Sequence, residues 1–145
     1  FEAGNVMKIT THLARHRTDR QRQAVFFEGG RHAVTRARLL ESYGLPATLS
    51  LIECQLETGR THQIRVHLAH TGHGLLGDPV YGGRRKIAKK ALSDASLALV
   101  SSFSRQALHA AVLGFEHPIS GKKMRFEAPY PTDFKILLEA LEKDG

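Results

Sequence analysis

Cysteine is almost absent from this chain of 145 residues, in which Cys54 is the single one. A lone cysteine cannot form a disulfide within the chain, which fits a protein that folds in a reducing compartment such as the cytoplasm. Cys54 lies within an apolar stretch, so we interpret it as a small core residue rather than as a nucleophile.

Long apolar segments are also missing. No stretch approaches the roughly 18 apolar residues that a membrane-spanning helix needs, and no signal peptide is recognisable. Internal repeats and low-complexity linkers are absent as well. The composition, with 41% hydrophobic and 24% charged residues, is ordinary for a soluble globular protein. We therefore expect one folded domain and no membrane partner.

Acidic residues are scarce relative to basic ones. Asp and Glu total 14 against 21 Lys and Arg, which gives a formal net charge of +7. A globular domain this basic favours a polyanionic partner, most simply nucleic acid. The alternative is a basic charge that only aids solubility, and charge alone does not separate the two.

Short alternating segments between turn residues predict strands at 8–15, 24–27, 33–41, 48–57 and 105–118. A turn at Ser120-Gly121 predicts a hairpin with one further strand. Helices are predicted at 60–71 and from a cap at Thr132, where an apolar stripe comprises Phe134, Leu137, Leu138 and Leu141. Residues 91–102 fit a short helix or a loop. The set predicts an α+β fold with a mainly antiparallel mixed sheet.

The predicted strand at 48–57 changes phase in its middle. Leu49 and Leu51 alternate correctly, but the apolar pattern then continues at Ile52 and Cys54. A slip of one residue moves side chains to the opposite face of a strand. We therefore expect a β-bulge here, or burial of both faces.

Four histidines, His62, His67, His70 and His73, crowd into the segment LETGRTHQIRVHLAHTGH. Steps of three residues fan side chains over about 120° of a helix instead of stacking them. The HExxH pattern is absent, and no acid or cysteine lies between these histidines. We therefore expect no metal site, and interpret the histidines as structural residues or RNA contacts.

Arg65 has no acidic neighbour on its own predicted helix. The positions three and four residues away hold Thr61, His62, Leu68 and Ala69. The helical projection puts Arg65 between Leu68 and Ala69, so its charge is expected to be partly buried and to need a partner. That partner must come from another segment, unless the side chain reaches water instead.

Residues 82–90, with the sequence GGRRKIAKK, carry five basic residues and no acid. A glycine-hinged basic loop suits a nucleic-acid backbone, although a solvated loop is an equal alternative. GRTHQIR is not a nucleotide phosphate loop, since GK[ST] is missing. Gly59 still lets the backbone approach a ligand beside the start of the predicted helix.

LETGRTHQIRVHLAHTGHGLLGDPVYGG resembles the motif of the large-ribosomal-subunit pseudouridine synthases. RHRTDRQRQAVFFEGGRHAVTRARLLE and RQALHAAVLGFEHPISGKKMRFEAPYPTDF resemble the flanking segments of that family, so the resemblance covers nearly the whole chain. It implies the catalytic-domain fold of that family and a cofactor-free isomerisation in RNA. A uridine is flipped into a pocket, and its base is detached from nitrogen and rejoined through carbon.

The resemblance also implies roles for individual residues. The family's essential aspartate pairs with an arginine that matches Arg65 of HQIR, which is therefore the expected catalytic residue. A pocket-shaping or RNA-contacting role is expected for Arg60, Thr61, His62 and Gln63. Phosphate contacts are expected for Arg84, Arg85 and Lys86. The implied partner is structured large-subunit ribosomal RNA, with no metal and no nucleotide or other cofactor.

One departure from the family is an absence. The aspartate motif, similar to HRLDxxTSG, does not occur, and the upstream Asp19 matches a different segment. The motif of the family's tyrosine is missing too, since Tyr43 lies in a predicted turn. We therefore expect residues 1–145 to be the C-terminal portion of one catalytic domain, inactive alone and part of a cytoplasmic monomer. The alternative is a non-catalytic RNA-binding module.

Overall fold

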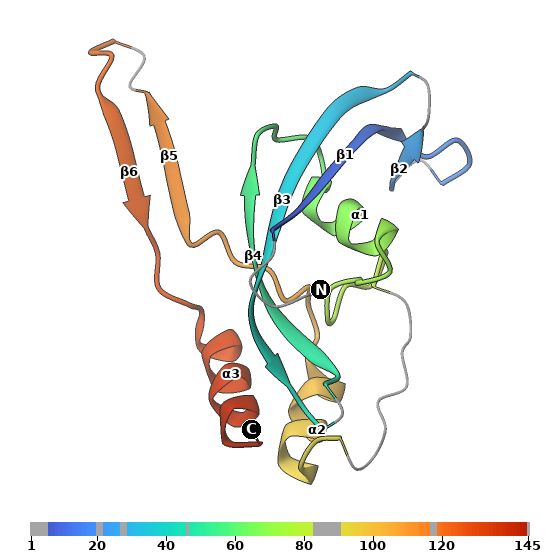
Figure 1. Ribbon diagram of the computed structural model, residues 1–145, viewed down its shortest axis with the longest axis vertical. Helices are drawn as coiled ribbons and strands as arrows, with labels where there is room; N and C mark the ends of the chain where they lie inside the picture. Colours follow the sequence, from blue (N-terminus) through green and yellow to red (C-terminus); the bar gives the residue numbers. More distant parts are fainter. Residues whose placement is uncertain are drawn as a thin grey trace.

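A computed structural model describes residues 6–19, 22–26, 29–45, 47–82, 91–116 and 119–144. Its centre is a four-stranded antiparallel sheet with the strand order β2-β1-β3-β4 (Figure 1). The strands are β1 (Val6–Arg15), β2 (Gln23–Phe26), β3 (Arg31–Tyr43) and β4 (Leu49–Leu56). These positions confirm the predicted strands, although β3 is longer at both ends than expected.

Alternation along β1 and β3 gives the sheet one apolar face, because successive side chains point to opposite sides. Ile9 and Leu13 of β1 are buried on this face, together with Ala33 and Ala37 of β3. The helix α1 (Gln63–His70) covers them (Figure 1). Val66 packs with Leu13 and Ala33, and Leu68 packs with Ile9 and Ala37. The packing of Val66 and Leu68 thereby fixes α1 against β1 and β3.

The phase change in β4 coincides with an irregularity in the sheet. Leu39 pairs with Ile52, but the next pair is Glu41 with Leu51, so Leu40 is an extra residue on β3. The sequence therefore predicted the position of the bulge correctly. The extra residue, however, lies in β3 and not in β4. Leu49 and Leu51 pack into one core cluster, whereas Ile52 and Cys54 pack into another. The two alternatives offered by the sequence, a bulge and burial of both faces, occur together.

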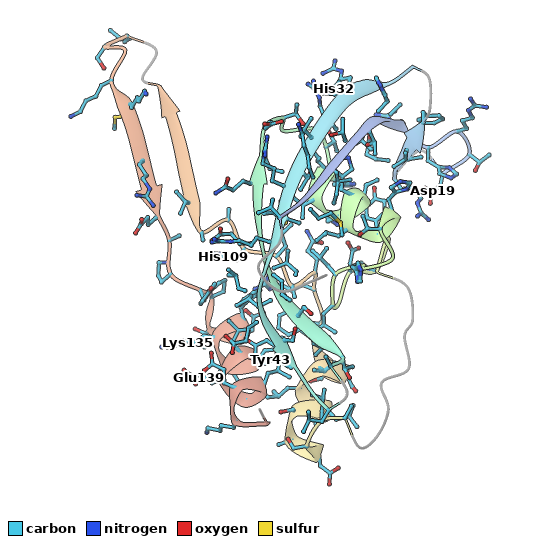
Figure 2. The ribbon with its side chains drawn as sticks, in the orientation of Figure 1. Asp19, His32, Tyr43, His109, Lys135 and Glu139 are labelled. Carbon is cyan, nitrogen blue, oxygen red and sulfur yellow. The ribbon has the colours of Figure 1, made fainter. Side chains whose placement is uncertain are left out.

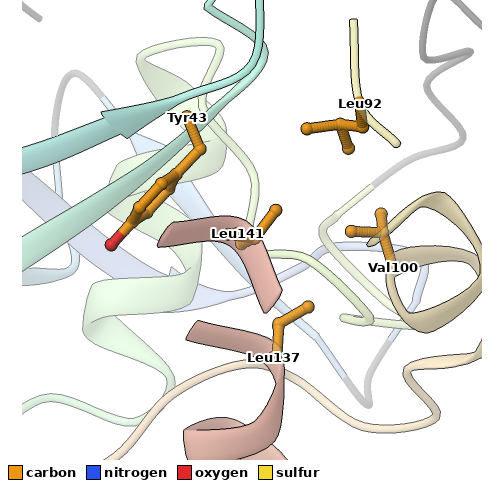
Figure 3. Packing of buried hydrophobic residues seen from close by; sticks show 5 residues of the cluster. All are labelled: Tyr43, Leu92, Val100, Leu137 and Leu141. Carbon is orange, nitrogen blue, oxygen red and sulfur yellow. The ribbon is translucent and has the colours of Figure 1, made fainter. Parts of the chain in front are cut away.

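A second core lies at the other end of β3 and β4. It joins α2 (Asp94–Ser102) and α3 (Thr132–Asp144) to Tyr43, and its buried members are Tyr43, Leu92, Val100, Leu137 and Leu141 (Figure 3). Ser93 caps α2 by accepting a hydrogen bond from the backbone N–H of Ser96, so the undecided segment 91–102 forms a helix. Of the predicted stripe of α3, Leu137, Leu138 and Leu141 pack in this core.

The hairpin of β5 (Val112–Glu116) and β6 (Lys123–Glu127) projects away from the four-stranded sheet (Figure 1). The predicted strand at 105–118 begins only at Val112. The residues before Val112 do not pair with a neighbouring strand in the described structure. Instead, the N–H of Ala107 donates a hydrogen bond to the carbonyl of Leu76, 2.8 Å away. This segment therefore runs along the loop that follows α1.

The secondary structure, with a mainly antiparallel sheet and a few helices, confirms the α+β class. None of the helices in the described ranges is long and apolar enough to cross a membrane.

Candidate functional site

The helix α1 begins at Gln63, three residues later than predicted. Its N-cap His62 has φ 54° and ψ 20°, a left-handed conformation that is uncommon for residues other than glycine. Arg60 and Gln63 close the preceding turn, because the N–H of Gln63 donates to the carbonyl of Arg60 at 3.1 Å. Arg60 and Thr61 therefore belong to a turn, and the prediction that the helix begins at residue 60 was wrong.

The side chain of Gln63 is only 2% exposed and stabilises this turn through hydrogen bonds. Its Oε1 accepts hydrogen bonds from the hydroxyl of Thr58 at 2.7 Å and the N–H of Arg60 at 3.0 Å. Its Nε2 donates to the carbonyl of Val34 and the hydroxyl of Thr35, both at 2.9 Å. These four bonds use the full capacity of an amide side chain. Of the two roles expected for Gln63, shaping the site or contacting RNA, its burial favours the first.

His67 is fully buried between two threonines. Its Nε2 lies 2.7 Å from the hydroxyl of Thr11, and its Nδ1 lies 2.7 Å from that of Thr35. Burial, with a smaller repulsion from His70, lowers the pKa of His67 to about 4. The imidazole is therefore neutral at physiological pH and joins β1, β3 and α1 as a structural residue.

Arg65 has its acidic partner within this chain. Its Nε donates to Oδ2 of Asp78 and its Nη2 to Oδ1, both at 2.8 Å, in a buried bidentate ion pair. The prediction of a partner from another segment is confirmed. The partner that the structure shows is Asp78 of this chain, in addition to the family's aspartate that the resemblance implies. The signal was available, because Asp78 is the one acid between Glu57 and Asp94.

Asp78 also organises the turn that carries it. Its Oδ1 accepts hydrogen bonds from the N–H groups of Val80 at 3.0 Å and Tyr81 at 3.1 Å. Burial acts to raise the pKa of Asp78, but the hydrogen bonds from Arg65 and these two N–H groups outweigh it and lower the pKa to about 2. The carboxylate is therefore charged and fixes the guanidinium of Arg65.

Tyr81 connects Arg65 to two other basic side chains. The guanidinium carbon of Arg65 lies 5.0 Å from the centre of the Tyr81 ring, and that of Arg22 lies 5.2 Å from it. The Tyr81 hydroxyl accepts from the N–H of Gln23 at 2.7 Å and lies 2.8 Å from Nδ1 of His62. Burial and the neighbouring Arg65 lower the pKa of His62, which favours its neutral form.

A groove of about 640 Å³ lies beside this cluster, between the ends of β1 and β3 and the turn before α1. Arg60 and Thr61 line it, as do Gly59 and Gln23. Nε of Arg60 donates to the carbonyl of His32 at 2.9 Å, which ties the side chain to the end of β3 (His32 is labelled in Figure 2). The structure thus brings the predicted residues 60–63 and Arg65 together.

Two predictions remain, the phosphate contacts and the absence of a metal site. Arg84, Arg85 and Lys86, the predicted phosphate contacts, lie outside the described residues. Within the described ranges, no group of three or more His, Cys, Asp or Glu side chains is arranged to hold a metal ion. The nitrogens of His67 and Nδ1 of His62 instead bond to hydroxyl groups.

The sequence of the chain is similar to that of known proteins. A family model described as RNA pseudouridylate synthase matches residues 3–70. The ribosomal large subunit pseudouridine synthase D of Zymomonas mobilis is 53% identical over 130 residues, which are 89% of this chain and 38% of that protein. The enzyme of the same name from Escherichia coli K12 is 48% identical over 132 residues, which are 91% of this chain and 39% of that protein.

The chain therefore spans about two fifths of the length of these curated relatives. Among solved structures, Human RNA Pseudouridylate Synthase Domain Containing 1 superposes with a TM-score of 0.66 at 23% identity. That match covers 87% of this chain and 49% of the human chain, and it concerns the fold alone. The family model and the curated relatives, about half identical over about nine tenths of the chain, show that the chain belongs to the family of RNA pseudouridine synthases.

Proposed function

We propose that this chain is part of an enzyme that converts specific uridines of large-subunit ribosomal RNA to pseudouridine in the cytoplasm. The names of relatives that are about half identical in sequence support this reaction. The net charge of +7 supports a polyanionic substrate. Because the chain spans about two fifths of those relatives, the proposal concerns the complete protein.

The reaction requires the target base to leave the helical stack, because its reacting atoms are otherwise covered by neighbouring bases. The base then separates from the ribose at nitrogen, rotates and rejoins through carbon. We propose that no cofactor takes part and that an aspartate from the rest of the protein acts as nucleophile or base.

The observation that carries the proposal is the way in which Asp78 holds Arg65. A guanidinium has five N–H donors. The ion pair with Asp78 uses Nε and Nη2, so the two N–H groups of Nη1 take no part in it. Arg65 thus offers a fixed, charged edge that can pair with a second carboxylate. In our proposal this edge receives the catalytic aspartate, and Asp78 acts as a positioning residue.

The neighbouring residues take supporting roles. Arg60 and Thr61 contact the RNA from the groove. His62 and Gln63 shape the turn that holds these two residues. Arg84, Arg85 and Lys86 contact phosphates, which suits their basic, glycine-preceded segment.

The direct experiment incubates the full-length protein with an unmodified large-subunit ribosomal RNA transcript. Pseudouridine is mapped by carbodiimide treatment and primer extension. We expect new carbodiimide-dependent stops at one or a few uridines, and none with residues 1–145 alone. Tight RNA binding by the full-length protein without any new stop would contradict the proposal and favour the non-catalytic RNA-binding module.

A further inference from the structure

The groove beside Arg60 contains two more arginines, Arg15 and Arg31, which the mechanism above does not use. Arg15 is the last residue of β1, and Arg31 is the first residue of β3. In the register of the sheet, Arg31 pairs with Leu13, two residues before Arg15. Side chains two residues apart share one face of a strand. Arg15 and Arg31 therefore project from the same face, on which α1 also packs.

Gly30 brings these two arginines close together. Its φ is +73°, and a Cβ at this position would lie 2.8 Å from the carbonyl oxygen of Leu13. Only glycine accommodates both the conformation and the close approach without a shift of the backbone. Gly30 therefore lies directly against the backbone of β1, and Arg31, which follows it, lines the groove.

The groove is strongly basic. Three arginines line it, and its lining includes no acidic residue. Both Arg15 and Arg31 are exposed, and neither forms an ion pair with any described carboxylate. Arg60 is held through Nε, a bond that does not use its terminal nitrogens. A Cβ at Gly59 would meet nothing within 4 Å, so the space beside that backbone is open.

We propose that this groove binds backbone phosphates of the RNA strand next to the target uridine, with Arg15 and Arg31 as phosphate contacts. Guanidinium groups match phosphate oxygens in charge and geometry. A volume of about 640 Å³ suffices for a nucleotide with its phosphates. Gln23 lines the groove and donates to the hydroxyl of Tyr81, whose ring contacts Arg65, so the bound strand runs beside the catalytic cluster. This inference rests on the proposed function.

The test compares the full-length protein with its Arg15→Ala/Arg31→Ala variant. Affinity for a fluorescein-labelled ribosomal RNA stem-loop is measured by anisotropy at several salt concentrations. Each lost phosphate contact lowers the slope of log Kd against log salt by about 1, so we expect a decrease of about 2. Affinity should fall about tenfold for each arginine.

A matched control is Arg36→Ala/Arg38→Ala, in which two exposed arginines that are paired with Glu57 and Glu53 are lost. An unchanged affinity and salt slope in Arg15→Ala/Arg31→Ala, or a loss no larger than in this control, would overturn the inference. Competition by inorganic phosphate at constant ionic strength as effective as that by RNA would show a site for the free anion instead. If the wild type binds RNA in this way but forms no pseudouridine, the proposed function fails while the groove stands.

Discussion

Arg65 and Asp78 affect the stability of the protein together, because their side chains form one ion pair. Their ion pair is buried, with side-chain exposures of 11% and 0%, whereas both side chains of Arg38 and Glu53 are about half exposed. Removing one member of a buried pair leaves an uncompensated charge, which costs far more than breaking a solvated pair. The site is therefore also a determinant of stability.

We expect Asp78→Asn to lower the free energy of unfolding by about 3–5 kcal/mol, because the charge of Arg65 remains buried without its partner. The double variant Arg65→Met/Asp78→Asn should recover much of this loss. Urea unfolding of the full-length protein measures both, with Arg38→Met as the exposed control, which should lose about 1 kcal/mol or less. Equal stability of Asp78→Asn and Arg38→Met would show that the pair is not buried as described.

His67 predicts a pH dependence of stability. In the unfolded chain a histidine takes up a proton near pH 6.5, whereas in the folded protein His67 does so only near pH 4. The unfolded state therefore binds more protons between these values, and stability falls as pH decreases from 6.5 towards 4. Between pH 7.5 and 5, the wild type should lose about 2 kcal/mol more than His67→Gln in urea unfolding. Equal losses would mean that His67 titrates normally.

At the scale of the elements, the loop after α1 decides where Asp78 lies. Gly77 has φ +74°, and a Cβ at this position would overlap the carbonyl oxygen of Arg105. The segment before β5 thus presses directly on the residue preceding Asp78. Gly72, at the other end of the loop, has φ +86° but nothing within 4 Å of its Cβ position.

These two glycines form a matched pair for mutation. Gly72→Ala should cost about 1 kcal/mol through backbone strain alone. Gly77→Ala should cost about 1–3 kcal/mol more, because the new methyl group must displace the backbone of Arg105. Thermal unfolding of both variants gives the comparison. If Gly77→Ala is no less stable than Gly72→Ala, then the loop does not pack on Arg105.

Some features of the fold and of the site could be predicted from the sequence, and others could not. Strand positions followed from alternation, and the bulge between β3 and β4 followed from the shift at Leu51 and Ile52. The pairing of Asp78 with Arg65 depends on how a glycine-rich loop returns to the helix, which alternation does not encode. The left-handed His62 also shortened the predicted helix, since the turn before it is held by the side chain of Gln63.

The described residues pack into a cluster around α2, α3 and Tyr43 and into clusters under α1, and these have different roles. The core formed by α2, α3 and Tyr43 anchors one end of β3 and β4. The core under α1 supports the site, with Arg65, Asp78 and Tyr81 on its loop side and the arginine groove at the ends of β1 and β3. The proposed catalytic cluster and the proposed phosphate groove thus share one support, and the proposed reaction needs RNA to be held still while one base moves.

The central claim is that Arg65, fixed by Asp78, presents a guanidinium edge to the catalytic aspartate. Arg65→Lys tests it most directly, because lysine preserves the charge beside Asp78 but lacks the planar fork. The control is Arg105→Lys, since Arg105 forms the same bidentate geometry with Asp133 at the surface. The measurement is the single-turnover rate of pseudouridine formation by the full-length protein on saturating ribosomal RNA. We predict a fall of about a hundredfold or more in Arg65→Lys, with RNA affinity and the control rate close to the wild type. A folded Arg65→Lys variant with the wild-type rate would contradict the account.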